Sequence, residues 1–294
     1  MESQIKNGVD VSIVIPAYNE EDAIATQIKS IQSVMNDTAW RYEIIVVNDG
    51  STDSTAERAN ISDVKLLSFP ENRGYGASLK TGITTARAEI IVIIDADGTY
   101  PCEAIPEMLA RSDKYDMVVG SRVGENVNIP FNRKQAKWFL RLLASFLSGK
   151  HIPDLNSGLR VIKKSVVEQF YDILPSGFSF TTTITLAFLC NEFLVYYHPI
   201  NYFKRVGSSK IHATHAYDFL LLILRTIVYF NPLKIFLPLG GALFVAGTGK
   251  LIYDITLDNL SESAVMGILG AIIIWTLGLL ADQNSRLRLS KRTK

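Results

Sequence analysis

The sequence predicts an α/β domain built on a mostly parallel sheet, followed by a hairpin of two membrane-spanning helices. Short apolar runs of strand length alternate with helical patterns over the first two hundred residues. Two much longer apolar segments then follow near the C-terminus. With 294 residues, the chain is long enough to hold both parts.

The expected strands are nearly continuous runs of Val and Ile, which is typical of parallel strands covered by helices on both faces. They are Val11–Ile15, Glu43–Val47, Val64–Phe69, Ile90–Ile94 and Met117–Val119, with helices expected at roughly Glu20–Met35, Asp53–Ala59, Tyr75–Ala86 and Glu103–Arg111. In such sheets, ligands bind beyond the carboxyl ends of the strands. The residues that end these runs are therefore the first candidates for chemistry.

The two C-terminal apolar segments are each about long enough to cross a hydrocarbon layer of ~30 Å. We place the transmembrane helices at about 233–253 and 264–281, within a hairpin over residues 233–283. A soluble helical cap is the alternative, but two such segments joined by a short polar loop favour a membrane hairpin.

The flanking charges predict the orientation of this hairpin. Its loop carries acidic residues and no basic residue, whereas basic residues precede the first span and fill the tail, residues 284–294. The positive-inside rule therefore places both chain ends, and the catalytic domain, in the cytoplasm. The polar N-terminus, which lacks a signal peptide, predicts the same side; this would be a bacterial inner membrane, or the ER membrane in a eukaryote.

Two further segments mix basic, aromatic and aliphatic side chains, as helices that lie flat in the headgroup layer do. They are residues 131–149 and a juxtamembrane helix over residues 216–232, so that the catalytic domain spans 1–215. The alternative for each is an ordinary helix that faces the core.

Composition excludes several classes of function. The 30 basic residues nearly balance the 29 acidic residues, so no global field favours nucleic acid. Cys102 and Cys190 are far apart and predict two reduced thiols rather than a disulfide or a metal site. The oligomeric state stays open, and a homo-oligomer is compatible with the sequence.

Asp95 and Asp97 end the fourth expected strand, after a run of buried residues. Two carboxylates at positions i and i+2 of an extended segment point the same way, so they can share one hard cation. Mg²⁺ or Mn²⁺ binds one or two carboxylates together with phosphate oxygens and water. The pair therefore predicts a divalent metal on a phosphorylated substrate.

Polar clusters also end the first two strands. Asp49, in Asn48-Asp-Gly-Ser-Thr-Asp53, can accept hydrogen bonds from a base or a ribose, and Pro16-Ala-Tyr-Asn-Glu20 begins a helix in the same way. Asn72-Arg-Gly-Tyr-Gly-Ala77 is not a dinucleotide fingerprint, because it follows the third strand and position 79 is Leu. With no phosphate-loop lysine motif either, kinase and dehydrogenase functions lose their main support.

Taken together, Pro16–Glu20, Asn48–Asp53, Asn72–Gly76 and Asp95–Asp97 resemble, in order and spacing, the family-2 glycosyltransferases with a GT-A (Rossmann-like) fold. The resemblance covers about residues 10–210. The chain is most similar to the polyprenyl-phosphate branch, which contains the dolichol-phosphate mannose synthases and the undecaprenyl-phosphate glucosyltransferases. The segments that carry this narrower resemblance are Gly120–Arg122, Asp154–Arg160, Gly177–Phe180 and Lys204–Lys210, together with the paired C-terminal spans.

The resemblance implies roles for individual residues. Asp95 and Asp97 would bind the metal on the diphosphate, with Asp97, Asp154 and Arg205 as the catalytic residues. The nucleoside pocket would hold Pro16, Tyr18, Glu20 and Asp49, and the acceptor phosphate would contact Arg122, Arg133, Arg205 and Lys210. Whether Asp154 is a base or an orienting residue stays open.

The sequence departs from the resemblance at two places. Many mannose synthases continue after the Asp-x-Asp motif with Leu-Gln-His, whereas this chain reads Gly98-Thr99-Tyr100, which leaves the third protein ligand of the metal undetermined. Thr181–Thr183 also stand where many members carry acidic residues. The donor sugar and nucleobase therefore cannot be carried over.

The predicted function is inverting transfer of a sugar from a UDP- or GDP-sugar to a polyprenyl phosphate in the bilayer. A transferase with a different lipid or saccharide acceptor is one alternative. A non-catalytic membrane tether that binds nucleotide sugars is another. A processive polysaccharide synthase is disfavoured because its usual Gln-x-x-Arg-Trp sequence is absent.

Overall fold

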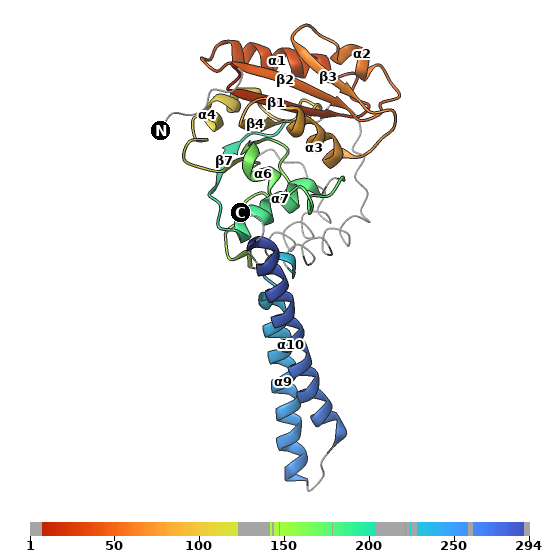
Figure 1. Ribbon diagram of the computed structural model, residues 1–294, viewed down its shortest axis with the longest axis vertical. Coiled ribbons are helices and arrows are strands. Elements are labelled where there is room, and N and C mark those ends of the chain that lie inside the picture. Colours follow the sequence, from red (N-terminus) through yellow and green to blue (C-terminus); the bar gives the residue numbers. More distant parts are fainter. Residues whose placement is uncertain are drawn as a thin grey trace.

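In the computed structural model, a long helical hairpin projects from an α/β head (Figure 1). The structure describes residues 8–122, 142, 144–146, 148–177, 179–203, 221, 224, 228–257 and 261–290. Most of the two predicted interfacial segments, residues 131–149 and 216–232, lies outside the described residues.

The described strands form one seven-stranded sheet in the order β3-β2-β1-β4-β6-β5-β7. All neighbours are parallel except β6, which runs antiparallel to β4 and β5. The strands are β1 (Val11–Ala17), β2 (Tyr42–Asn48), β3 (Val64–Ser68), β4 (Ile90–Ile93), β5 (Met117–Arg122), β6 (Arg160–Lys163) and β7 (Val195–Ile200). The five predicted strands and the mostly parallel sheet are confirmed; β6 and β7 were not predicted.

Helices cover both faces of this sheet. They are α1 (Ile24–Asn36), α2 (Thr55–Ala59), α3 (Tyr75–Thr85), the 3-10 turn η1 (Cys102–Ala104), α4 (Ile105–Leu109), α6 (Lys164–Glu168) and α7 (Phe180–Cys190). Successive residues of a strand point to opposite faces, and this alternation divides the core. Ile13 and Ile15 pack in a cluster with α1 and α4, whereas Val14 packs in a cluster with α3 and α7.

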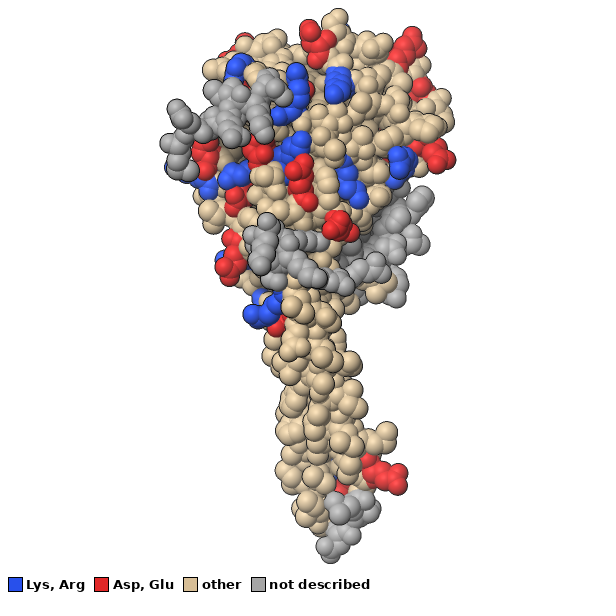
Figure 2. All heavy atoms as spheres, in the orientation of Figure 1, with Lys and Arg blue, Asp and Glu red and all other residues tan. Residues whose placement is uncertain are grey.

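The hairpin consists of α9 (Leu233–Thr256) and α10 (Glu262–Ser290). Both helices are long and apolar enough to cross a membrane, and only 11% and 17% of their most apolar windows are buried. A core helix of a soluble protein would be mostly buried, so these two surfaces require a different apolar environment. Figure 2 shows that the shaft carries almost no charge between its base and its tip.

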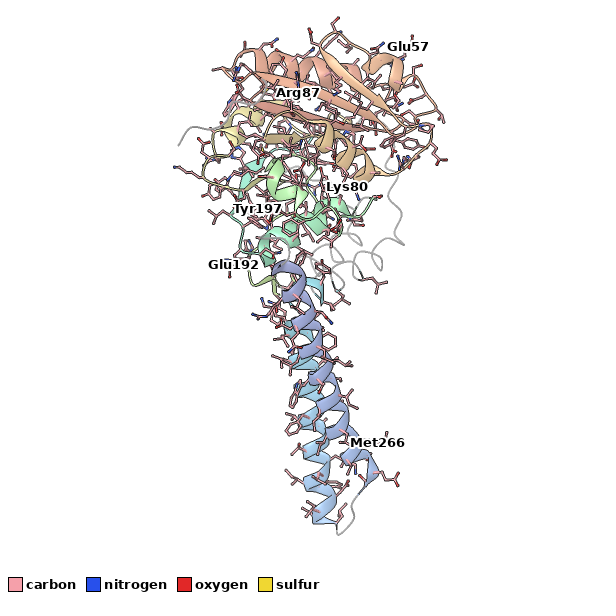
Figure 3. The ribbon with its side chains drawn as sticks, viewed as in Figure 1. Glu57, Lys80, Arg87, Glu192, Tyr197 and Met266 are labelled. Carbon is pink, nitrogen blue, oxygen red and sulfur yellow. The ribbon has the colours of Figure 1, made fainter. Side chains whose placement is uncertain are left out.

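The two helices of the hairpin pack closely along their length. The Trp275 indole N–H donates to the Leu237 carbonyl at 3.2 Å, and its ring lies 5.4 Å from that of Phe244. Large side chains on the outer surfaces, such as Val245 and Met266, are 70% and 72% exposed. Figure 3 labels Met266, which lies toward the tip of the shaft. The sequence-based hairpin is therefore confirmed as a pair of long apolar helices.

Candidate active site

The candidate site lies at the carboxyl edge of the sheet, and the direction of β6 explains how it is assembled. Asp97 follows β4, and Arg122 ends β5. Because β6 is antiparallel to both strands, the segment 154–158 that enters β6 lies at the same edge. Tyr202 follows β7, which is parallel to β5, and so arrives at that edge too.

The segments after β1 and β2 interlock through hydrogen bonds between backbone and side chains. The Asn19 N–H donates to Ser51 Oγ at 3.0 Å, and the Thr52 N–H donates back to Asn19 Oδ1 at 2.9 Å. Asn19 holds a φ of 51°, a conformation that Asn tolerates better than most residues. The Glu20 N–H donates to Thr55 Oγ1 at 2.8 Å. These bonds fix the backbone around Pro16, Tyr18 and Glu20, whose binding roles stay predictions.

Asp49 is 3% exposed and turns toward the segment before α3. Its Oδ1 accepts a hydrogen bond from the Arg73 N–H at 2.7 Å, and its Oδ2 accepts one from the Gly74 N–H at 3.0 Å. The carboxylate thus satisfies backbone donors that would otherwise be unpaired at the start of a helix. Asp49 thereby fixes the backbone before α3, and its direct contact with a nucleoside stays a prediction.

Asp95 and Asp97 are each oriented by a neutral hydroxyl. Asp95 Oδ1 accepts a bond from the Tyr75 hydroxyl at 2.9 Å, and Asp97 Oδ1 accepts one from Thr99 Oγ1 at 2.6 Å. The Thr99 N–H also donates to Asp97 Oδ1, at 3.2 Å. A hydroxyl donor fixes a carboxylate without neutralising its charge, and carboxylate oxygens are ligands that Mg²⁺ and Mn²⁺ prefer.

The departure from Leu-Gln-His after the Asp-x-Asp motif has a structural role. Thr99 orients Asp97, as described above, and the Tyr100 hydroxyl accepts a hydrogen bond from the Gly158 N–H at 2.7 Å. Among the described residues, no group of three or more His, Cys, Asp or Glu side chains could hold a metal ion. The role of Asp95 and Asp97 as metal ligands stays a prediction.

Asp154 and Arg122 form a mostly buried, bidentate ion pair. Arg122 Nε donates to Asp154 Oδ2 at 2.7 Å, and Nη2 donates to Oδ1 at 2.8 Å. Burial alone would raise the pKa of Asp154, but the bonds from Arg122 outweigh it and hold this pKa below its usual range. The guanidinium also lies over the Tyr202 ring, 5.2 Å from its centroid. Asp154 is thus ionised, and both of its carboxylate oxygens accept hydrogen bonds from Arg122.

Arg160 holds the segment between Asp154 and Gly158 by hydrogen bonds to its backbone. Its side chain is fully buried, and burial lowers its pKa. The guanidinium donates to the Ser157 carbonyl at 2.8 Å, to the Leu155 carbonyl at 3.1 Å and to Thr185 Oγ1 at 2.7 Å. Because a buried arginine needs such partners, this network holds the loop in one conformation.

Three of the predicted acceptor residues, Arg133, Arg205 and Lys210, lie outside the described residues. Sequence reasoning did not single out Tyr75, Tyr100, Gly158 or Arg160 as functional residues. Tyr75, Gly158 and Arg160 belong to motifs that carried the family resemblance, whereas Tyr100 lies in the stretch that departs from it. What no motif indicates is which partner each residue contacts across the sheet edge.

The comparisons with known proteins agree with this architecture. Residues 12–170 match the family described as Glycosyl transferase family 2, and residues 231–287 match the GtrB C-terminal hairpin. The chain is 28% identical over 258 residues to the undecaprenyl-phosphate 4-deoxy-4-formamido-L-arabinose transferases of Salmonella choleraesuis (strain SC-B67) and Salmonella newport (strain SL254). Each match covers 81% of this chain and 73% of the relative.

Solved structures of glucosyl-3-phosphoglycerate synthase from Mycobacterium tuberculosis share the fold. The complex with UDP has a TM-score of 0.60 at 20% identity, covering 75% of this chain and 80% of that one. The complex with Mn²⁺, UDP-glucose and phosphoglyceric acid has a TM-score of 0.59 at 20% identity, with the same coverage. The predicted GT-A architecture is confirmed, and the family match spans more than half of the chain. This chain therefore belongs to glycosyl transferase family 2 and is a glycosyltransferase that carries a C-terminal hairpin of the GtrB type.

Proposed function

We propose that this chain transfers a sugar from a nucleotide sugar to a polyprenyl phosphate at the cytoplasmic surface of a membrane, with inversion at the anomeric carbon. The observation that carries the proposal is that one short segment connects the two halves of the site. Asp154, at its start, binds Arg122, and Gly158, at its end, lies against Asp95. Four peptide steps span at most about 14 Å, so the carboxylates and the arginine lie within reach of one substrate pair.

The donor half would use Asp95 and Asp97 to hold Mg²⁺ or Mn²⁺. Their orientation by Tyr75 and Thr99 supports this assignment, as does the binding of these metals in the solved relatives' complexes. A bound divalent cation would stabilise the negative charge that develops on the departing nucleoside diphosphate. The chain's own contribution is to hold the two carboxylates fixed beside the interlocked loops that follow β1 and β2.

The acceptor half would use Arg122 to place a phosphate. A guanidinium has five N–H donors, and Asp154 takes one from Nε and one from Nη2, so others remain for phosphate oxygens. The acceptor phosphate is already anionic at neutral pH, so it requires positioning more than deprotonation. Since both oxygens of Asp154 accept bonds from Arg122 and its lowered pKa makes it a weak base, we assign it as a positioning residue rather than a base. Arg133, Arg205 and Lys210 would add further cationic contacts.

Transfer then needs a single displacement. An oxygen of the acceptor phosphate forms a bond to the anomeric carbon as the bond from that carbon to the diphosphate oxygen breaks, and the electron pair leaves with the nucleoside diphosphate. Attack from the face opposite the leaving group inverts the configuration. Residues fixed by the Asp154–Gly158 segment would hold both reactants in line.

A membrane location supports a lipid acceptor. The hairpin exposes large apolar side chains along both helices, and the described part of the predicted interfacial segment exposes Leu142 by 52% and Phe146 by 69%. Both are helical and four residues apart, so they share one face. A polyprenyl phosphate stays in the bilayer, so an anchored head would meet its phosphate at the headgroup layer. The basic flanks and acidic loop of the hairpin support cytoplasmic chain ends.

The test is a donor screen in membranes. Membranes containing the full-length chain are incubated with radiolabelled UDP- and GDP-sugars, and lipid-linked product is extracted and identified. We expect one class of donor to label a polyprenyl phosphate. The Asp97→Ala variant should stay folded and membrane-bound but form no product. Full activity of this variant would refute the assignment of Asp97 as a metal ligand. If none of the UDP- and GDP-sugars gave a lipid-linked product, the assignment of a polyprenyl phosphate as the acceptor would be refuted.

A further inference from the structure

Tyr75 reaches from the start of α3 to the first carboxylate of the Asp-x-Asp motif. Its hydroxyl donates to Asp95 Oδ1 at 2.9 Å. A phenol keeps its proton at physiological pH, so the Tyr75 hydroxyl acts as a hydrogen-bond donor to Asp95.

The backbone before Tyr75 is fixed on the nucleoside side of the site. Asp49 accepts hydrogen bonds from the N–H groups of Arg73 and Gly74, the two residues that precede Tyr75. Gly74 has a φ of 99°, which glycine adopts without the strain that a side chain would add. The direction in which Tyr75 leaves the chain is thus set by Asp49.

The backbone on both sides of Tyr75 also packs against the loop over residues 175–177. A Cβ at Gly74 would lie 2.5 Å from the Ser176 carbonyl oxygen, and one at Gly76 would lie 2.2 Å from that of Pro175. The Ala77 N–H donates to the Ser176 carbonyl at 3.0 Å. The ring of Tyr75 is therefore mounted on a backbone with little freedom to move.

Asp95 also lies against a second fixed group, the backbone of Gly158. A Cβ at Gly158 would lie 2.3 Å from Asp95 Oδ2, so the carboxylate occupies the space that a side chain would need. The Gly158 N–H is held in turn by the Tyr100 hydroxyl. The hydroxyl of Tyr75 and the backbone of Gly158 thus both restrict the carboxylate.

We propose that Tyr75 is a positioning residue for Asp95, and that its hydroxyl holds this carboxylate in the orientation that binds the divalent metal. Partners that hydrogen-bond a ligating carboxylate typically change metal affinity by about 10–100-fold when they are lost. The bonds also form a continuous connection from Asp49, through Arg73 and Gly74, to Asp95. The inference rests on the proposed function, because it takes Asp95 as a metal ligand.

The experiment measures nucleotide binding rather than turnover. Full-length protein in detergent is titrated with UDP and with GDP, each in Mn²⁺ and in EDTA, and the nucleotide that binds wild type more tightly is used. The ratio of the two affinities is the metal-dependent gain. Tyr75→Phe should reduce this gain on the order of tenfold. Its affinity in EDTA and its melting temperature should match those of wild type.

Tyr171→Phe is the matched control, because it removes a hydroxyl that meets Thr84 at 3.4 Å, near the other end of α3. Its metal-dependent gain should equal that of wild type. In an Asp95→Asn background, Tyr75→Phe should cause no further loss, since a residue that acts through Asp95 has nothing left to orient. UDP and GDP lack the sugar that is transferred, so a contact between Tyr75 and that sugar cannot produce the expected result.

Two results would overturn the inference while leaving the proposed function intact. One is an unchanged metal-dependent gain in Tyr75→Phe, and the other is a loss of equal size with and without the Asp95 carboxylate. A wild-type protein that shows no metal-dependent gain would overturn the metal assignment and this inference together. If Tyr75→Phe lowered the metal-dependent gain only in protein that retains Asp95, the result would support both the metal assignment and this inference.

Discussion

Gly158 lies so close to Asp95 that a Cβ built on it would stand 2.3 Å from Oδ2 and 2.7 Å from Oδ1. Such distances are well inside van der Waals contact, so any side chain at position 158 must displace the carboxylate. The backbone of the Asp154–Gly158 segment therefore forms one wall of the proposed metal site. Through Asp154, the same segment also fixes Arg122.

The first prediction follows from this contact. Gly158→Ala should lower the rate of sugar transfer by about 100-fold, the scale expected when a catalytic group moves by about 1 Å. Gly158 has no positive φ, so the backbone should accept alanine. Transfer rate and melting temperature are measured for this variant and for Gly241→Ala, whose Cβ meets nothing within 4 Å. Wild-type transfer by Gly158→Ala would contradict the placement of Asp95.

The second prediction concerns stability and its dependence on pH. Asp154→Asn leaves Arg122 mostly buried without its charged partner, which should cost about 3–5 kcal/mol of unfolding free energy at pH 7. The folded-state pKa of Asp154 is depressed, so its contribution is fully present above the unfolded pKa of about 3.9. It is lost as the pH falls through the lower, folded-state pKa.

Unfolding is therefore followed between pH 3 and pH 7 for wild type and Asp154→Asn in detergent. The difference between the two proteins should be largest at neutral pH and should narrow below about pH 4. A difference that stays constant over the whole range would show that the ionised carboxylate is not what Asp154 contributes.

The third prediction separates the acceptor half of the site from the donor half. Arg122→Lys keeps the positive charge but loses the planar fork that bonds both Asp154 oxygens. We expect the ratio kcat/KM for the lipid acceptor to fall at least about tenfold, as for loss of one charge-assisted bond. The affinity for the nucleotide, measured without acceptor, should stay within about twofold of wild type. If kcat/KM for the acceptor and the affinity for the nucleotide fell by the same factor, Arg122 would not belong to the acceptor half of the site.

The fourth prediction concerns the hairpin. A Cβ at Gly247 would lie 2.9 Å from the Ile268 backbone nitrogen, whereas nothing lies within 4 Å of one at Gly249. Gly247→Leu should therefore push α9 and α10 apart and lower the melting temperature in detergent. Gly249→Leu, two residues along the same helix, should leave it unchanged. Equal effects of the two substitutions would contradict the packing of the hairpin.

Much of the fold could be predicted because its signals are local. Runs of Val and Ile such as Val11–Ile15 indicated the parallel strands, and their polar ends indicated where chemistry would lie. The short β6 and the partly polar β7 lack such runs, so the sequence did not reveal the antiparallel strand. That strand brings Asp154 and Gly158 to the site, and the contacts of both depend on it.

The candidate site residues were likewise recognisable only where their signal is local in the sequence. Asp95 and Asp97 were recognisable because two carboxylates directly follow a buried strand. The partners that orient them were not, because Tyr75 is 20 residues from Asp95 in the sequence. Thr99 explains the unexpected sequence after the motif, since both its N–H and its hydroxyl bond Asp97. Arg133, Arg205 and Lys210 keep the roles that the resemblance implies as predictions.

The identity of the acceptor is the central claim, and one comparison tests it most directly. Purified full-length protein is given its nucleotide sugar and Mn²⁺ together with a polyprenyl phosphate, the corresponding polyprenol or soluble phosphoglyceric acid, and the product is identified by mass spectrometry. Of the three acceptors, we expect only the polyprenyl phosphate to be glycosylated, because recognition needs both the lipid chain and the phosphate group. Transfer to the polyprenol or to phosphoglyceric acid at a comparable rate would contradict the account.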